Sequence, residues 1–108
     1  MKKILKIYRT ENGKEPFLDW LNTLRKKDKP SFFRIRDRLN RIAEQGNYGD
    51  YKAVGEGVYE LRFFFGSGYR VYFGEDGETI VLLLCGGGKS SQRQDIKKAK
   101  EYWSLYHE

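Results

Sequence analysis

The most constraining feature of the sequence is an uninterrupted apolar run, Ile80 to Cys85, which follows the turn signal Asp76-Gly77 and precedes three consecutive glycines. A short continuous apolar run between turn signals is typical of a strand that is covered on both faces. The run is also far shorter than the roughly twenty apolar residues that a membrane-spanning helix needs. We therefore expect Thr79 to Cys85 to form the central strand of a sheet, and we expect no membrane partner.

Further strands are predicted from alternating apolar and polar residues. Val58 to Phe65 and Tyr69 to Phe73 both alternate with a period of two, and Gly66-Ser67-Gly68 between them predicts a three-residue hairpin loop. Lys3 to Arg9 predicts a strand near the N-terminus. The region 46–57 has four glycines, and we expect it to be a loop.

Three segments have the apolar spacing of helices. Pro16 suits the first turn of a helix that continues to about residue 27, and a second helix is expected from Ser31 to Gln45. Ser91 to Gln94 has a capping-box pattern that starts a terminal helix. The expected order is β-α-α-β-β-β-α in one domain, residues 1–108. This is an α+β fold with an antiparallel meander sheet, an N-terminal helical hairpin and a C-terminal helix.

The charge of the chain favours an anionic partner. The formal net charge is +6, and residues 1–54 carry 14 basic against 7 acidic side chains. Such a basic half is typical of a protein that binds a polyanion or an acidic protein, although a solvated surface is the alternative. One cysteine and one histidine predict neither a disulfide nor a zinc site, so we expect no metal and no cofactor. Because the N-terminus lacks a signal-peptide pattern, we expect a cytoplasmic location.

Basic residues cluster in three places. In the predicted hairpin Arg62 lies opposite Tyr72, and Arg62 and Arg70 are diagonal neighbours on one face, where either Glu60 or a bound phosphate could separate their charges. A second cluster, on a polar face of the second helix, suggests either a nucleic-acid interface or a solvated face; it consists of Arg34, Arg38 and Arg41.

The third basic position is Lys89, which directly follows the triple glycine. The spacing of this segment does not match the phosphate loop of nucleotide hydrolases. Lys89 and the first amides of the last helix could still bind one phosphate. The alternative is that the glycines only let the backbone leave the sheet.

Three segments together resemble a known protein family. They are Gly57-Val58-Tyr59-Glu60-Leu61-Arg62, Gly68-Tyr69-Arg70-Val71-Tyr72, and Gly88-Lys89-Ser90 with the following Gln92, Asp95-Ile96 and Ala99. Their order and spacing resemble the RelE/ParE toxin superfamily, and within it the phage-related addiction module killer proteins near the HigB-type toxins. With a weaker match over 17–47, the resemblance covers most of the chain.

This resemblance implies the toxin of a type II toxin–antitoxin system. RelE-like toxins cut mRNA in the ribosomal A site without a metal ion: the 2′-hydroxyl attacks the adjacent phosphate and basic side chains stabilise its charge. The implied partners are the ribosome, mRNA and a cognate antitoxin, commonly a small helix-turn-helix protein with an acidic segment. Alternatives are a ParE-like inhibitor of DNA gyrase, a non-catalytic interaction protein of the same fold, or a simple nucleic-acid binder.

The resemblance also assigns roles to residues. Arg62 and Arg70 match the basic positions of two adjacent strands and Lys89 matches the basic position after the last strand, so these three are the implied catalytic residues. Ser90 and Ile96 stand where RelE itself has a basic residue and a tyrosine. The implied RNA contacts are therefore spread over other side chains, namely Lys52, Tyr48, Tyr72 and Gln92. The helix arginines Arg34, Arg38 and Arg41 are expected to bind antitoxin or RNA.

Overall fold

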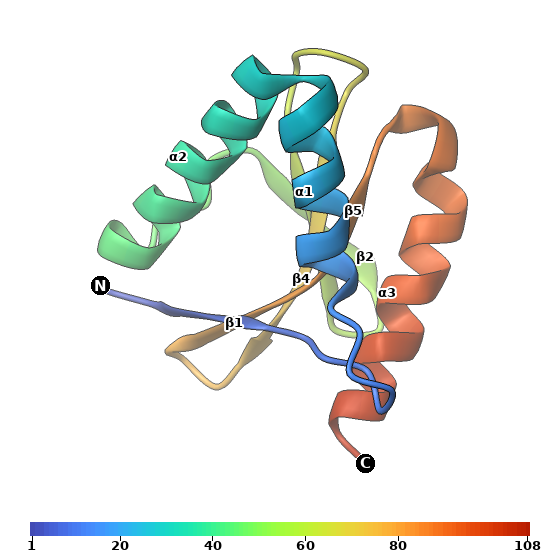
Figure 1. Cartoon of the computed structure of the whole chain (residues 1–108). Helices are drawn as coiled ribbons and strands as arrows, with labels where there is room; N and C mark the ends of the chain where they lie inside the picture. The colour runs from blue at the N-terminus through green and yellow to red at the C-terminus, as the bar shows by residue number, and fades with distance from the viewer.

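A five-stranded sheet runs through the middle of the molecule, with two helices on one face and one helix on the other (Figure 1). The computed structural model describes all residues from 1 to 108. In chain order the elements are β1 (Ile4–Ile7), α1 (Pro16–Lys27), α2 (Lys29–Gln45), β2 (Tyr51–Gly55), β3 (Val58–Arg62), β4 (Arg70–Asp76), β5 (Ile80–Gly87), a 3-10 turn (Lys89–Ser91) and α3 (Gln92–Tyr106).

The strand order across the sheet is β1-β5-β4-β3-β2. β2 to β5 form an antiparallel meander, and β1 pairs in parallel with β5 through Ile4 opposite Ile80. The predicted α+β class and the meander are therefore confirmed. β5 is buried on both faces as expected, but the middle position belongs to β4, because the additional strand β2 extends the sheet beyond β3.

The sheet separates two hydrophobic cores. The larger one, with 13 buried residues, lies between the sheet and α1 and α2; it includes Phe17, Ile35 and Phe73. The smaller one, with 7 buried residues, lies under α3 and includes Tyr72 and Ala99. None of the helices is long and apolar enough to cross a membrane.

The two N-terminal helices form the expected hairpin. Pro16 is in the first turn of α1, where its missing amide hydrogen leaves no bond unmade. Asp28 lies between the helices, and its carboxylate accepts a hydrogen bond from the Ser31 amide as the N-cap of α2. α2 ends at Gly46, which takes the left-handed conformation that glycine adopts readily.

The predicted loop over 46–57 is wrong in part, because it contains the edge strand β2. Four of its five residues, all except Val54, are exposed, so the strand shows no buried apolar face in its sequence. Gly49 precedes the strand with φ of +73°, and Gly55 and Gly57 make the turn into β3. The glycines that suggested a loop therefore mark the ends of a strand.

The predicted register of the β3–β4 hairpin is wrong by two residues. Arg62 lies directly opposite Arg70, and Tyr72 lies opposite Glu60. The connection is longer than expected, because β3 ends at Arg62 and β4 begins at Arg70. A shift of two residues leaves the same side chains on the same face, so the apolar pattern cannot distinguish the two registers.

Candidate functional site

A hollow of about 410 Å³ at the β3–β4 hairpin brings together the three basic residues that the sequence singled out. Its lining consists of Arg62, Arg70 and Lys89 with the hairpin residues from Phe63 to Tyr69 other than Phe65. We call it the basic hollow. Arg62 ends β3, Arg70 begins β4 directly opposite, and Lys89 follows β5. The amide of Lys89 donates to the Ser67 carbonyl at 3.3 Å, which fixes the 3-10 turn against the hairpin.

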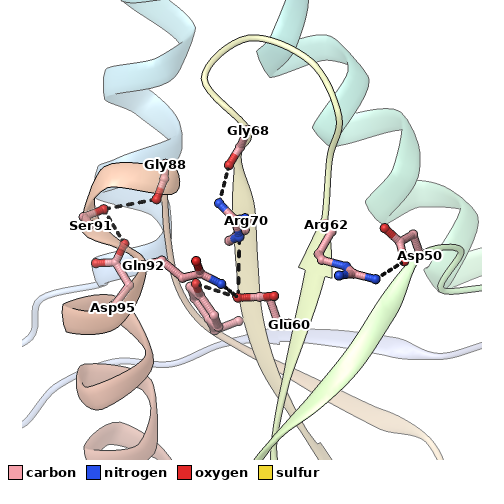
Figure 2. Close-up of polar contacts among 10 residues, drawn as sticks. Asp50, Glu60, Arg62, Gly68, Arg70, Gly88, Ser91, Gln92 and Asp95 are labelled. Carbon is pink, nitrogen blue, oxygen red and sulfur yellow. Dashed lines mark hydrogen bonds and ion pairs between the residues drawn. The ribbon is translucent and has the colours of Figure 1, made fainter.

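Arg70 is held over a buried carboxylate (Figure 2). Its Nε lies 3.6 Å from Glu60 Oε2, and its Nη1 donates to the Gly68 carbonyl at 2.9 Å. The Arg70 side chain is 16% exposed, whereas that of Glu60 is fully buried. Of the two alternatives that the sequence left open, the structure therefore contains Glu60 as a counter-ion for Arg70.

Glu60 accepts two further hydrogen bonds from residues of different elements. Its Oε2 accepts from the Tyr72 hydroxyl at 3.0 Å and from Gln92 Nε2 at 2.9 Å. Burial, and then the charge of Glu60, raise the pKa of Tyr72 well above its ordinary value, so Tyr72 remains a proton donor to the carboxylate. Glu60 Oε1 is buried without a hydrogen-bond partner. The carboxylate thus links β3, β4 and α3 beneath the hollow.

Arg62 has a separate and more exposed counter-ion. Its Nη2 donates to Asp50 Oδ1 at 2.9 Å, and both side chains are about a third exposed, at 35% and 33%. The Arg62 amide also donates to the Asp50 carbonyl at 3.0 Å. Figure 2 shows Arg62 directed toward Asp50, while Arg70 lies between Gly68 and Glu60, so each arginine has its own carboxylate. Two arginines can therefore face each other across the strands without net repulsion.

Lys89 is the basic residue of the hollow whose side chain has no ion-pair or hydrogen-bond partner. It is exposed, and its Cβ lies against Gly68. Gly86 and Gly87 precede Lys89, and other side chains pack directly against their backbone. A Cβ on Gly86 would overlap the Trp20 ring, and one on Gly87 would overlap the Asp95 carboxylate. Gly86 and Gly87 therefore have a packing reason and remain part of β5, and the chain leaves the sheet only at Gly88.

The predicted capping box at Ser91 is wrong. Ser91 is the N-cap residue of α3 but makes no side-chain cap bond, and its hydroxyl instead donates to Asp95 Oδ2 at 2.6 Å. Asp95 lies one turn into the helix and also accepts from the Cys85 thiol through its carbonyl.

The four expected RNA contacts differ in accessibility. Lys52 is exposed on β2 opposite Glu60, and Gln92 is half-buried with its amide on Glu60. Tyr72 is fully buried, and Tyr48 is 9% exposed, stacked on Phe73 at 4.9 Å between ring centroids. Neither tyrosine therefore presents a ring face to a ligand, which corrects the expectation that they contact RNA.

The arginine stripe of α2 is not a uniform surface. Arg34 lies over the Phe65 ring and Arg41 is exposed, but Arg38 is committed to the fold. Its guanidinium donates to three backbone carbonyls, those of Tyr48 at 2.8 Å, Arg62 at 2.8 Å and Asp50 at 2.6 Å. Burial lowers the pKa of Arg38, while Asp50 opposes this shift. The expectation that Arg38 binds antitoxin or RNA is therefore corrected. The Arg38 side chain connects α2 to the residues before β2 and to the end of β3.

Sequence reasoning missed two members of the site. Asp50 lies in the region that was expected to be a loop, and no sequence pattern there indicates that its carboxylate pairs with Arg62 on β3. Phe64 was assigned to an alternating strand, whereas the structure leaves it 84% exposed at the rim of the basic hollow. A phenylalanine at an even-numbered position between Arg62 and a glycine-rich turn breaks the apolar alternation, and this was the available signal.

The chemistry of the basic hollow suits a phosphate group. Guanidinium forks match phosphate oxygens in geometry, and an ammonium adds a mobile positive charge. The chain has no group of three or more His, Cys, Asp or Glu side chains arranged to hold a metal ion. The positively charged side chains that line the hollow are those of the two arginines and Lys89.

One comparison with known proteins gives a family. The chain is 45% identical over 84 residues to an uncharacterized protein of Haemophilus influenzae, and the alignment covers 78% of this chain and 82% of that protein. The chain therefore belongs to the same family as that protein. No protein-family model matches the chain. Because this relative is uncharacterized, function has to be inferred from the site.

Proposed function

We propose that this chain is the toxin of a type II toxin–antitoxin pair of the RelE/ParE superfamily and acts as a ribosome-dependent mRNA endoribonuclease in the cytoplasm. The observation that carries the proposal is the convergence of Arg62, Arg70 and Lys89 on one hollow of about 410 Å³. These side chains come from three separate elements, yet they are the three that the resemblance assigns to catalysis. Their charges suit the reacting phosphate of an RNA strand.

The reaction needs no group beyond the RNA and the basic side chains. The 2′-oxygen forms a bond to the adjacent phosphorus, the bond from phosphorus to the 5′-oxygen breaks, and a 2′,3′-cyclic phosphate and a 5′-hydroxyl result. The 2′ proton passes to solvent and the leaving oxygen takes a proton from solvent, to which the hollow is open. Arg70 is held in place by Glu60 and Gly68, so it stabilises the developing charge without having to reorganise.

The proposed antitoxin is a small protein with an acidic segment. Support comes from the basic excess of residues 1–54 and from the exposed Arg34 and Arg41 on α2. Charge complementarity of this kind steers the association of a basic surface with an acidic peptide. Purification of the chain from its host with a small acidic protein attached is the expected result, and isolation of the chain alone would contradict this part of the proposal.

A non-catalytic interaction protein of the same fold is the second candidate. It is favoured by the ion pairs Arg62–Asp50 and Arg70–Glu60, which already neutralise two of the three basic groups. It is also favoured by the burial of Tyr48 and Tyr72, which leaves two proposed RNA contacts inaccessible. An inhibitor of DNA gyrase would belong to this second class, because it acts by binding.

Mapping of mRNA 5′ ends after induction of the chain in cells separates the candidates. Translation-dependent cuts in mRNA would support the nuclease. DNA breaks with intact mRNA would indicate gyrase inhibition. If neither effect is seen, the non-catalytic interaction protein is the remaining candidate. With purified ribosomes, a 2′-deoxy nucleotide at the cut site should abolish cleavage, whereas a chelator should not. Loss of cleavage with chelator would overturn the metal-independent mechanism.

Lys89→Gln is the sharpest variant, because this side chain has no internal partner and its loss should leave the fold intact. We expect about a 10²- to 10³-fold loss of cleavage rate, the typical effect of removing one group that stabilises an oxyanion. Lys97→Gln is the matched control, an exposed lysine on α3 that does not line the hollow. A wild-type rate for Lys89→Gln would remove this lysine from the site.

A further inference from the structure

Phe64 is the most exposed large apolar side chain that lines the basic hollow, with 84% of its surface accessible. A single exposed apolar residue is common on protein surfaces and means little by itself. Here its position is informative, because Arg62, Arg70 and Lys89 line the same hollow. A flat apolar ring beside a cluster of positive charge is the combination by which proteins bind single-stranded nucleic acid.

Phe64 lies two residues beyond Arg62, in the connection that follows β3. The Phe63 amide still donates to the Tyr69 carbonyl at 3.0 Å, so the hairpin pairing continues past Arg62, and strand alternation puts Phe64 on the side of Glu60 and Arg62. Exposure rises along this row of side chains, from a fully buried Glu60 through a 35% exposed Arg62 side chain to Phe64. Successive members of such a row are about 6.6 Å apart. This separation lets a phosphate at Arg62 and a base of the same strand on Phe64 be bound together.

The hairpin that carries Phe64 is anchored on its other face. Phe63 is 4% exposed in the larger core, and Phe65 packs edge-on against Tyr69 beneath Arg34. The Tyr69 hydroxyl donates to Asp28 Oδ2 at 2.9 Å, which ties the hairpin to the start of α2. The neighbours of Phe64 are thus committed to the fold, and the ring is presented on a fixed support.

We propose that Phe64 is a stacking platform for a nucleobase of single-stranded RNA whose adjacent phosphate lies in the basic hollow. This inference rests on the proposed function and identifies a residue that contributes to substrate affinity at that site. An acidic peptide would be matched by the charges alone, whereas an exposed aromatic ring beside them adds a surface that every base can use. The observations therefore favour RNA over a peptide.

The test compares binding of short unstructured RNA by Phe64→Ala and by the wild-type chain, followed by fluorescence anisotropy. Loss of one stacked base predicts about 5- to 100-fold weaker binding, while Phe64→Tyr, which keeps a ring, should bind like the wild type. Phe33→Ala is the matched control, because Phe33 is 43% exposed on α2 and does not line the hollow. It should bind RNA with unchanged affinity.

Two further readouts separate stacking from a general loss of affinity. With an RNA of the same length that lacks all bases, Phe64→Ala and the wild type should bind equally. The salt dependence of binding should be unchanged in Phe64→Ala, but its slope should fall by about 0.7 in Lys89→Gln, because that variant loses one phosphate contact. A fluorescent base analogue should be quenched by the wild type and not by Phe64→Ala.

Three results would overturn the inference. Phe64→Ala and the wild type could bind normal RNA with equal affinity. Phe64→Ala could lose as much affinity for the RNA without bases as for normal RNA. The wild-type chain could fail to bind single-stranded RNA at all. If Phe64→Ala bound RNA normally but lost a co-purifying small protein, the ring would belong to a protein interface and the inference would be wrong. Cleavage of ribosome-bound mRNA by the wild type is measured separately, so failure of the proposed function is distinguishable from failure of the stacking role.

Discussion

Arg38→Ala should be strongly destabilising although Arg38 belongs to a basic stripe on a surface helix. The substitution removes three hydrogen bonds from a guanidinium to the carbonyls of Tyr48, Asp50 and Arg62, and a stacking contact in which the guanidinium carbon lies 4.7 Å from the Phe63 ring centre. At about 1 kcal/mol for each bond and about 0.5 kcal/mol for the ring contact, the loss is about 3.5 kcal/mol. This is a large share of the stability of a small domain, which is about 5–15 kcal/mol.

Urea unfolding followed by circular dichroism measures this loss. Arg41→Ala is the matched control, because Arg41 is an exposed arginine one turn further along α2, and its change should be within about 0.5 kcal/mol. Arg38→Lys should recover only part of the stability, since an ammonium cannot bond three carbonyls in the planar geometry of a guanidinium. Equal midpoints for Arg38→Ala and Arg41→Ala, with unchanged slopes, would refute the structural role of Arg38.

Three further predictions test other parts of the structure. Glu60→Gln should lower the free energy of unfolding by about 3 kcal/mol, because it leaves the largely buried Arg70 without its counter-ion, and the double variant with Arg70→Gln should recover part of the loss in urea unfolding. Burial, and then Asp95, raise the pKa of the Cys85 thiol to about 12, so native protein should resist alkylation at pH 8 while urea-unfolded protein reacts. Hydrogen bonds from Ser31 and then Tyr69 hold the pKa of Asp28 below its ordinary value, so its contribution to stability is present at neutral pH and is lost as the pH falls through the folded-state pKa. Asp28→Asn should therefore melt below the wild type at pH 7, and this gap should close under about pH 4.

The elements with a strong apolar period were predictable from the sequence. The three helices and β5 are confirmed close to their expected ends, because each buries a stripe or a run of apolar side chains. β2 was not predictable in this way, since an exposed edge strand has no buried face to leave a pattern. The register of the β3–β4 hairpin was also missed, because its seven-residue connection and not its apolar pattern decides between two registers of equal parity.

The convergence of Arg62, Arg70 and Lys89 was predictable, since the alternation put both arginines on one face of a hairpin and Lys89 directly follows the next strand. The inward role of Arg38 was not, because its three carbonyl partners are backbone groups brought close by the fold and leave no trace in the residue types. Tyr72 was expected at the surface from its place opposite the odd-numbered apolar face. The face of the sheet that carries Tyr72 is covered by α3, so Tyr72 is buried in the smaller hydrophobic core.

The two ion pairs of the basic hollow divide its arginines into different kinds of group. Arg70 has a fully buried counter-ion held by Tyr72 and Gln92, so an incoming phosphate cannot displace Glu60 without unburying it. Arg62 has a counter-ion that is one third exposed, and water can solvate Asp50 once the pair opens. In the proposed function a phosphate would exchange with Asp50 at Arg62 and meet Arg70 as a fixed neighbour, while Lys89 supplies the charge that no internal carboxylate cancels. Because the two arginine–carboxylate pairs are neutral overall, the attraction of the hollow for an anion at long range depends on Lys89, and the arginines act at contact distance, where their geometry orients the phosphate.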